Sequence, residues 1–111
     1  MSDLKQVVKA NELLLVYGEL LTTLQKDIME DYYAYNLSLA EIAKNRKISR
    51  SAVSDSLKKS LQKLDFFEEK LQIITKNKDL LNDLQDIQDL VKDPGIKEKL
   101  NEMKRKNING I

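Results

Sequence analysis

Apolar side chains recur along most of the chain at spacings of three and four residues, the period of an amphipathic α-helix. Only three Gly and one Pro interrupt the 111 residues, and runs of β-branched residues are rare. The pattern therefore predicts an all-α fold with a three- to four-helix core, a long fourth helix and C-terminal helices. The predicted helices span residues 3–21, 22–35, 38–44, 49–77, 79–92 and 96–106.

Polar residues at two predicted helix starts support these boundaries. Thr22 with Gln25, and Ser38 with Glu41, have the spacing of capping boxes, in which each side chain bonds the backbone N–H of the other residue. Gly18 is the weak point of the first helix. The side chains expected to form the buried faces of the first two helices are Val7, Val8, Leu14, Leu15, Leu21, Leu24, Ile28, Tyr32 and Tyr35.

The stretch from Leu37 to Lys63, with the sequence LSLAEIAKNRKISRSAVSDSLKKSLQK, carries the strongest functional signal. Two helices are joined by a tight turn at residues 45–48, and Ser49 is placed to cap the second helix. This arrangement predicts a helix-turn-helix over residues 38–63, whose second helix enters the DNA major groove. Small side chains are expected where the helices cross, at Ala40 and Ala43, with Leu39, Ile42, Ile48, Val53 and Leu57 filling the space between them.

Charge is concentrated in this element. The net charge of the whole chain is only +1, but residues 38–63 carry seven Lys and Arg against two acidic residues, a balance of +5. Residues 1–37 carry −3 and residues 64–111 carry −1. A local excess of positive charge on a chain that is otherwise neutral or acidic indicates a phosphate-binding surface.

Individual roles follow from position in the motif. The first turns of the second helix reach base edges, where Arg50 could bind guanine through two hydrogen bonds, and later cations such as Lys58 meet phosphates. Two residues depart from this pattern: Lys47 stands at a turn position often held by Gly and is expected at positive φ, and Asp55 would repel phosphate but could accept from cytosine. The predicted nucleic-acid-binding residues are Lys44, Arg46, Lys47, Ser49, Arg50, Ser51, Ser54, Asp55, Lys58 and Lys59.

Composition argues against catalysis. The chain has no Cys and no His, which removes thiolate chemistry, disulfides and the commonest general base and metal ligand. It also has no Gly-rich phosphate loop. We therefore expect no enzyme, no cofactor and no metal. A signal peptide and a membrane span are not expected either, so residence in the cytoplasm and no membrane partner are predicted.

The C-terminal part is predicted to be a helical extension. We expect residues 1–63 to form the domain that contains the helix-turn-helix, and residues 64–111 to form a dimerisation region. The alternative is that its apolar residues form an intramolecular core. Asp79, Asp83, Asp86 and Asp93 form either a solvated acidic stripe or a face directed at the basic region 44–63. The predicted dimer interface comprises Leu64, Phe67, Leu71, Ile74, Leu80, Leu84 and Ile87.

Residues 12–74 resemble the YlxM family, small bacterial proteins whose helix-turn-helix is similar to sigma-factor region 4. The resemblance departs from the family pattern at Leu24 and Lys47. The segments that show the resemblance are LLVYGELLT at 14–22 with Gln25, DYY at 31–33, LSLAEIA at 37–43, ISRSAV at 48–53 and DFFEEKL at 65–71.

A homodimer is expected from the motif, because two half-sites raise the limited affinity of one recognition helix. This resemblance adds a regulatory role in the signal recognition particle pathway to the DNA binding that the motif predicts. The alternative that it leaves open is an accessory protein without DNA binding, which contacts the RNA or a protein of the signal recognition particle through its basic face.

Overall fold

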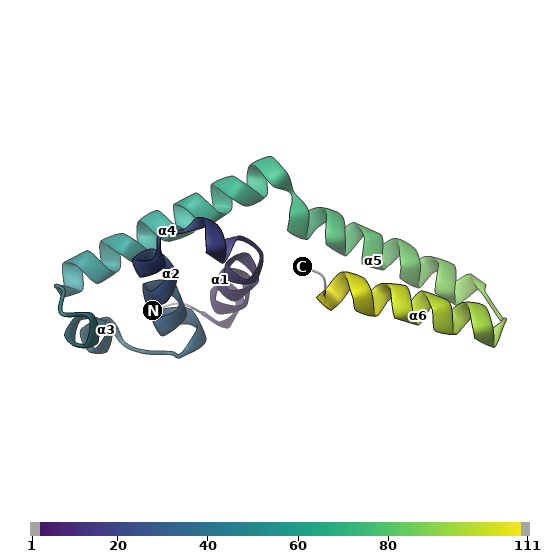
Figure 1. Ribbon diagram of the computed structural model, residues 1–111, viewed down its shortest axis with the longest axis horizontal. Helices are drawn as coiled ribbons and strands as arrows, with labels where there is room; N and C mark the ends of the chain where they lie inside the picture. Colours follow the sequence, from purple (N-terminus) through teal and green to yellow (C-terminus); the bar gives the residue numbers. More distant parts are fainter. Residues whose placement is uncertain (1–2, 110–111) are drawn as a thin grey trace. The chain divides into compact units, whose positions relative to one another are not determined.

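The computed structural model describes residues 3–109, and this part of the chain is helical and contains no strand, which confirms the predicted all-α fold (Figure 1). Two compact units divide the chain between Leu71 and Gln72 and are described separately below. The helices are α1 (Leu4–Tyr17), α2 (Thr23–Met29), α3 (Leu39–Arg46), α4 (Arg50–Leu71), α5 (Ile73–Leu90) and α6 (Pro94–Asn109), with a 3₁₀ turn η1 (Gly18–Leu20) and a π-helical turn η2 (Glu30–Ala34).

Side-chain caps define the helix starts in the first unit, as the sequence predicts. The Thr22 hydroxyl accepts from the Gln25 N–H at 3.2 Å, and the Gln25 side chain accepts from the Thr22 N–H at 3.1 Å. The same reciprocal pair joins Ser38 and Glu41 at 3.1 and 3.0 Å. Each box satisfies two of the N–H groups that a helix leaves without a partner at its N-terminus.

The core of the first unit forms where α1, α2 and α3 pack against one side of α4 (Figure 1). Burying a large apolar side chain contributes about 1.5–3 kcal/mol, so this layer supplies most of the unit's stability. Its most completely buried side chains are Tyr17, Ile28, Met29, Ile42, Val53 and Leu64.

Part of the predicted buried faces is wrong. On α1 the buried face is made by Ala10, Leu13, Leu14 and Tyr17, which leaves Val8 58% and Leu15 72% exposed. Leu24 and Tyr35 are also exposed. The π-helical turn explains the error after α2, because the Tyr35 N–H bonds the Glu30 carbonyl, five residues back, at 2.9 Å. The extra residue in this turn rotates Tyr33 into the core in place of its neighbours.

The fourth helix ends earlier than the predicted Asn77. Gln72 adopts a left-handed conformation with φ of 53°, so α4 stops at Leu71 and α5 begins at Ile73. No Gly or Pro marks this break in the sequence. Leu64, which the sequence pattern assigned to the extension, lies in the core of the first unit and is fully buried.

The second unit is a hairpin of α5 and α6. Leu84 and Leu100 are buried, and polar bonds join the helices: Gln88 Nε2 donates to Asn101 Oδ1 at 2.6 Å, and Lys104 Nζ donates to Gln88 Oε1 at 2.6 Å. Pro94 begins α6 rather than preceding it, because a missing N–H is harmless in the first turn of a helix.

Candidate nucleic-acid interface

The turn between α3 and α4 is tighter than predicted and begins later. Helix α3 extends to Arg46, and Lys47 follows in a left-handed conformation with φ of 58° and ψ of 43°, which confirms its expected positive φ. The Ile48 N–H bonds the Ala43 carbonyl at 3.1 Å, which closes the end of α3. The Ser49 hydroxyl then accepts from the Ala52 N–H at 3.0 Å and caps α4, as the sequence indicates.

Apolar contacts fix α3 against α4. Ile42 and Ala43 on α3, and Val53 and Leu57 on α4, are buried where the two helices meet. Ala40 is exposed, so the prediction that it lies at the crossing is wrong. The buried residues of α3 are Ile42 and Ala43, and Ala40 lies near the start of the helix.

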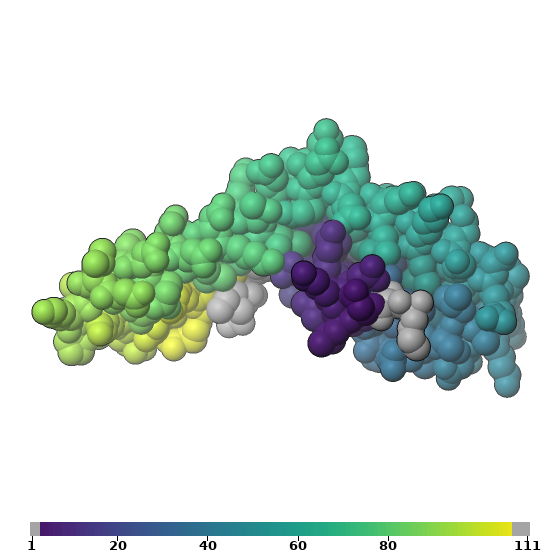
Figure 2. All heavy atoms as spheres, turned by 180° about the vertical axis from the view of Figure 1, so that it is seen from behind, coloured from purple at the N-terminus to yellow at the C-terminus, as the bar shows by residue number. Residues whose placement is uncertain are grey.

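The outer face of α4 is polar and cationic. Its start presents Arg50, Ser51, Ser54 and Lys58, all exposed. Successive helical residues are about 100° apart around the axis, so these four side chains fall within one sector of about 100°, next to the sector of the buried residues. In the space-filling view one side of α4, in teal, is left uncovered by the other helices (Figure 2).

Ion pairs separate the cations of this region into two groups. Lys59 Nζ lies 3.0 Å from Asp55 Oδ2, one helical turn away, and both side chains are more than half exposed, so the pair adds little stability. Among residues 3–109, by contrast, no ion pair with a carboxylate engages Lys44, Lys47, Arg50 or Lys58. These four charges remain available to an anionic ligand.

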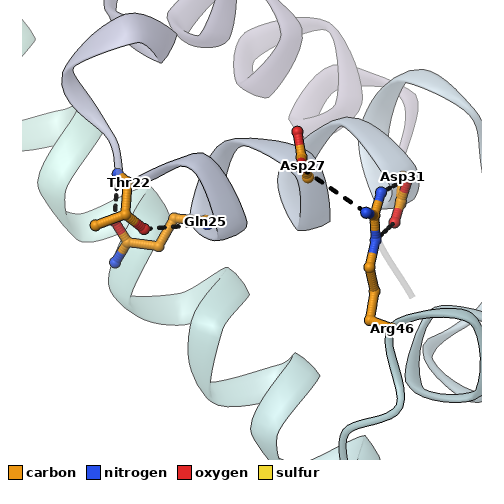
Figure 3. A network of polar contacts seen from close by, with 5 residues as sticks. All are labelled: Thr22, Gln25, Asp27, Asp31 and Arg46. Atoms are coloured by element: carbon orange, nitrogen blue, oxygen red, sulfur yellow. Dashed lines mark hydrogen bonds and ion pairs between the residues drawn. The ribbon is translucent and has the colours of Figure 1, made fainter.

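Arg46 lies differently from the other predicted contacts (Figure 3). Its Nε and Nη2 donate to the two carboxylate oxygens of Asp31 at 2.9 and 3.1 Å, and Nη1 lies 3.8 Å from Asp27 Oδ2. The hydrogen bond to Asp31 raises the pKa of Arg46 above its ordinary value. Arg46 is therefore bound by carboxylates of its own unit.

Sequence reasoning missed the acidic side of this arrangement. Asp27 and Asp31 precede the helix-turn-helix and belong to α2 and η2. Their spacing of four residues places both carboxylates on one helical face, and this pattern is visible in the sequence. The sequence does not indicate, however, that Arg46 contacts them. Arg46 is itself exposed, as are the other predicted binding residues around the turn and along α4: Lys44, Lys47, Ser49, Arg50, Ser51, Ser54, Asp55, Lys58 and Lys59.

Within the part of the chain that the structure describes, no group of three His, Cys, Asp or Glu side chains could hold a metal ion. No helix in this part is long and apolar enough to cross a bilayer.

Comparison with known proteins identifies relatives of this chain by sequence similarity. The chain is 44% identical over 71 residues to a UPF0122 protein of Thermoanaerobacter sp. (strain X514), covering 64% of this chain and 61% of that protein. It is 36% identical over 86 residues to a UPF0122 protein of Fusobacterium nucleatum, covering 78% and 84%. A UPF0122 protein of Malacoplasma penetrans is 52% identical over 58 residues, covering 52% and 54%.

The match spans about three fifths of the length of the first of these relatives, the Thermoanaerobacter protein (61%). A family profile described as "Putative helix-turn-helix protein, YlxM / p13 like" matches residues 4–108, nearly the whole chain. This confirms the family that the sequence motifs indicated: the chain belongs to the YlxM / p13-like helix-turn-helix family, UPF0122.

Proposed function

We propose that this protein is a DNA-binding regulator that places α4 in the major groove. The observation that carries the proposal is the sector of Arg50, Ser51, Ser54 and Lys58, exposed at the start of the second helix of a helix-turn-helix, with no carboxylate pairing its two cations. Helices of this kind read bases with the residues of their first turns.

Each polar residue of the sector then has a defined role. Arg50 binds a guanine edge through two hydrogen bonds, and Ser51 and Ser54 reach neighbouring bases. Lys58, one turn further along α4, binds phosphate. Lys44 at the end of α3 and Lys47 in the turn bind the backbone on the other side of the groove, which sets the register of α4.

A homodimer suits this site, because two recognition helices bind two half-sites with much higher affinity than one. Leu71, Leu80 and Ile87 of the predicted interface are more than two fifths exposed, whereas Leu64, Ile74 and Leu84 are buried in the chain. Phe67 is half-buried, and its ring centroid lies 6.1 Å from that of Tyr17. We therefore keep Leu71, Leu80 and Ile87 as the proposed contact between copies. Light scattering after size exclusion should give twice the mass of 12.8 kDa, and a monomer at micromolar concentration would rule the dimer out.

The test of function is fluorescence anisotropy with random genomic duplexes and with signal recognition particle RNA, at two salt concentrations. We expect duplex binding whose affinity falls steeply with salt. Arg50→Ala should relax sequence preference, whereas Lys58→Ala should weaken all duplexes alike and lower the salt slope by about 1. Lys76→Ala, which removes an exposed cation from the second unit, serves as the control and should change neither.

RNA-selective binding would instead favour the accessory role in the signal recognition particle pathway that the family resemblance implies. The cationic sector by itself fits either polyanion, but an exposed helix face matches the wide major groove of duplex DNA better than the deep, narrow major groove of duplex RNA. This difference in groove shape is the reason for placing DNA first.

A further inference from the structure

One acidic residue, Asp31, holds both ends of α3. Its backbone carbonyl accepts from the Leu37 N–H at 2.9 Å, immediately before the Ser38 cap of the helix. Its carboxylate accepts the two hydrogen bonds from Arg46, the last residue of the same helix (Figure 3). The first helix of the motif is thus fixed at its entry and at its exit by a residue outside the motif.

The bond at the exit is well built for orientation. Asp31 is 8% exposed, and its carboxylate uses both oxygens on the planar guanidinium, a geometry that fixes direction as well as distance. The third nitrogen of Arg46 faces Asp27 at 3.8 Å. A compact cation such as Lys could supply the charge but not this fork of donors.

Arg46, the residue that Asp31 orients, stands directly before the left-handed turn at Lys47. Lys47 reverses the chain, and the Ile48 N–H returns to Ala43 of α3. Ser49 then starts α4 through its cap on Ala52. The direction of the Arg46 backbone therefore sets the direction in which α4 leaves α3.

We propose that Arg46 is a positioning residue, not a nucleic-acid contact: its paired bonds to Asp31 set the angle of α4 and thereby the preference of the protein for specific over random duplexes. This proposal rests on the proposed DNA binding. It predicts that the two partners act as a unit, so that losing Asp31 is as harmful to specific binding as losing Arg46.

The experiment compares Asp31→Asn, Arg46→Gln and the double variant. The probes are a duplex enriched by the wild-type protein from a random pool and an unselected duplex of the same length. Each single variant should bind the enriched duplex about tenfold more weakly and the unselected duplex less than about twofold more weakly, in the range that positioning networks transmit. The double variant should lose no more than either single variant.

Lys44→Gln is the matched control, because it removes an exposed cation from the same helix without touching Asp31. It should weaken both duplexes alike. The proposal is overturned if Asp31→Asn binds the enriched duplex as well as or better than wild type, which would mean that a freed Arg46 reaches phosphate. It is also overturned if Arg46→Gln weakens both duplexes equally and lowers the salt slope by about 1.

A measurement without DNA separates this proposal from the proposed function. Hydrogen exchange at the Ile48 amide should become at least about tenfold faster in both single variants, with the amides of α1 unchanged. If unchanged Ile48 protection is found, the positioning role is excluded whatever the DNA results. If the pool yields no enriched duplex, the proposed sequence-specific DNA binding is refuted. The hydrogen-exchange result then still decides whether the bonds between Asp31 and Arg46 fix the end of α3. If Asp31→Asn does not fold, Arg46→Lys replaces it in the experiment. This variant keeps the positive charge but removes the planar pair of donors that binds both oxygens of Asp31.

Discussion

Replacing Lys47 by Gly tests the structure and the proposed interface with one substitution. Lys47 occupies the left-handed region with φ of 58°, at the position that ends α3. This conformation crowds the Cβ of an L-residue against the following carbonyl, and Gly has no Cβ. Gly is accordingly the commonest residue just past the end of a helix. The Lys47→Gly variant should therefore be more stable than the wild-type protein.

The magnitude follows from two opposing contributions. Relief of the left-handed conformation stabilises the folded state by about 1–2 kcal/mol. Gly also makes the unfolded chain more flexible, which costs about 0.5–1 kcal/mol. A net gain of about 0.5–1 kcal/mol remains, and the urea midpoint should rise by a comparable number of molar units if the slope for this small unit is about 1 kcal/mol per molar.

The assay can report on the first unit alone. All four Tyr residues lie between residues 17 and 35 and the chain has no Trp, so intrinsic tyrosine fluorescence during urea unfolding follows the unit that contains Lys47. Lys47→Ala is the matched control, because it removes the charge but keeps a Cβ. If Lys47→Gly is no more stable than Lys47→Ala, the left-handed conformation is not costing the protein stability and the reasoning fails.

DNA binding should respond in the opposite way. Both variants remove the same cation, so both should bind every duplex more weakly to the same extent, although only Lys47→Gly is stabilised. A difference in affinity between the two would mean that the shape of the turn, rather than the charge of Lys47, governs the contact.

Three further predictions concern stability. Ser60 is fully buried and its hydroxyl has no hydrogen-bond partner in the structure, so Ser60→Ala should raise the free energy of unfolding by about 1 kcal/mol, measured by urea titration against exposed Ser54→Ala. The Ser38 N–H lowers the pKa of Glu41, so the stability that this carboxylate adds is complete above its ordinary value of 4.5 and lost as the pH falls through the lower folded value. Glu41→Gln keeps the acceptor and should flatten that part of the pH–stability curve; an unchanged acid limb would contradict the assignment. Leu64→Ala should cost about 2–5 kcal/mol and should leave the dependence of the midpoint on protein concentration as it is in the wild-type protein, because Leu64 is buried within its own unit; a change in that dependence would place Leu64 between copies.

Helix starts could be predicted from the sequence, and helix ends could be predicted only in part. The starts at Ser38 and Ser49 depend on local bonds between a hydroxyl and N–H groups two or three residues away, and such spacings are visible in a chain. The ends at Lys47 and Gln72 depend on left-handed residues that are not Gly. The conformation of Lys47 is expected from its position in the motif, whereas nothing in the composition marks Gln72, because Gln has no local preference for the left-handed region.

The candidate site shows the same division. Exposure of Lys58 follows from helical periodicity once Val53 and Leu57 are assigned to the core, whereas Arg50, which the same periodicity places near the buried side, is exposed at the first residue of α4. The contact between Arg46 and Asp31 does not follow from periodicity. A cation that faces solvent and one that faces Asp31 would have the same charge and the same position in the motif. Only the packing of η2 beside the end of α3 decides between them.

The choice of Lys at the turn is best understood as a compromise between stability and charge. Lys44, Arg46 and Lys47 all lie at the C-terminus of α3, where a cation is favoured by the helix dipole. Arg46 is bound to Asp31, which leaves Lys44 and Lys47 to face an anionic ligand. Gly at position 47 would improve the turn and halve that remaining charge. A residue that breaks the local rule for a helix end, at the one turn that lies in the proposed interface, is what selection for binding over maximal stability would leave.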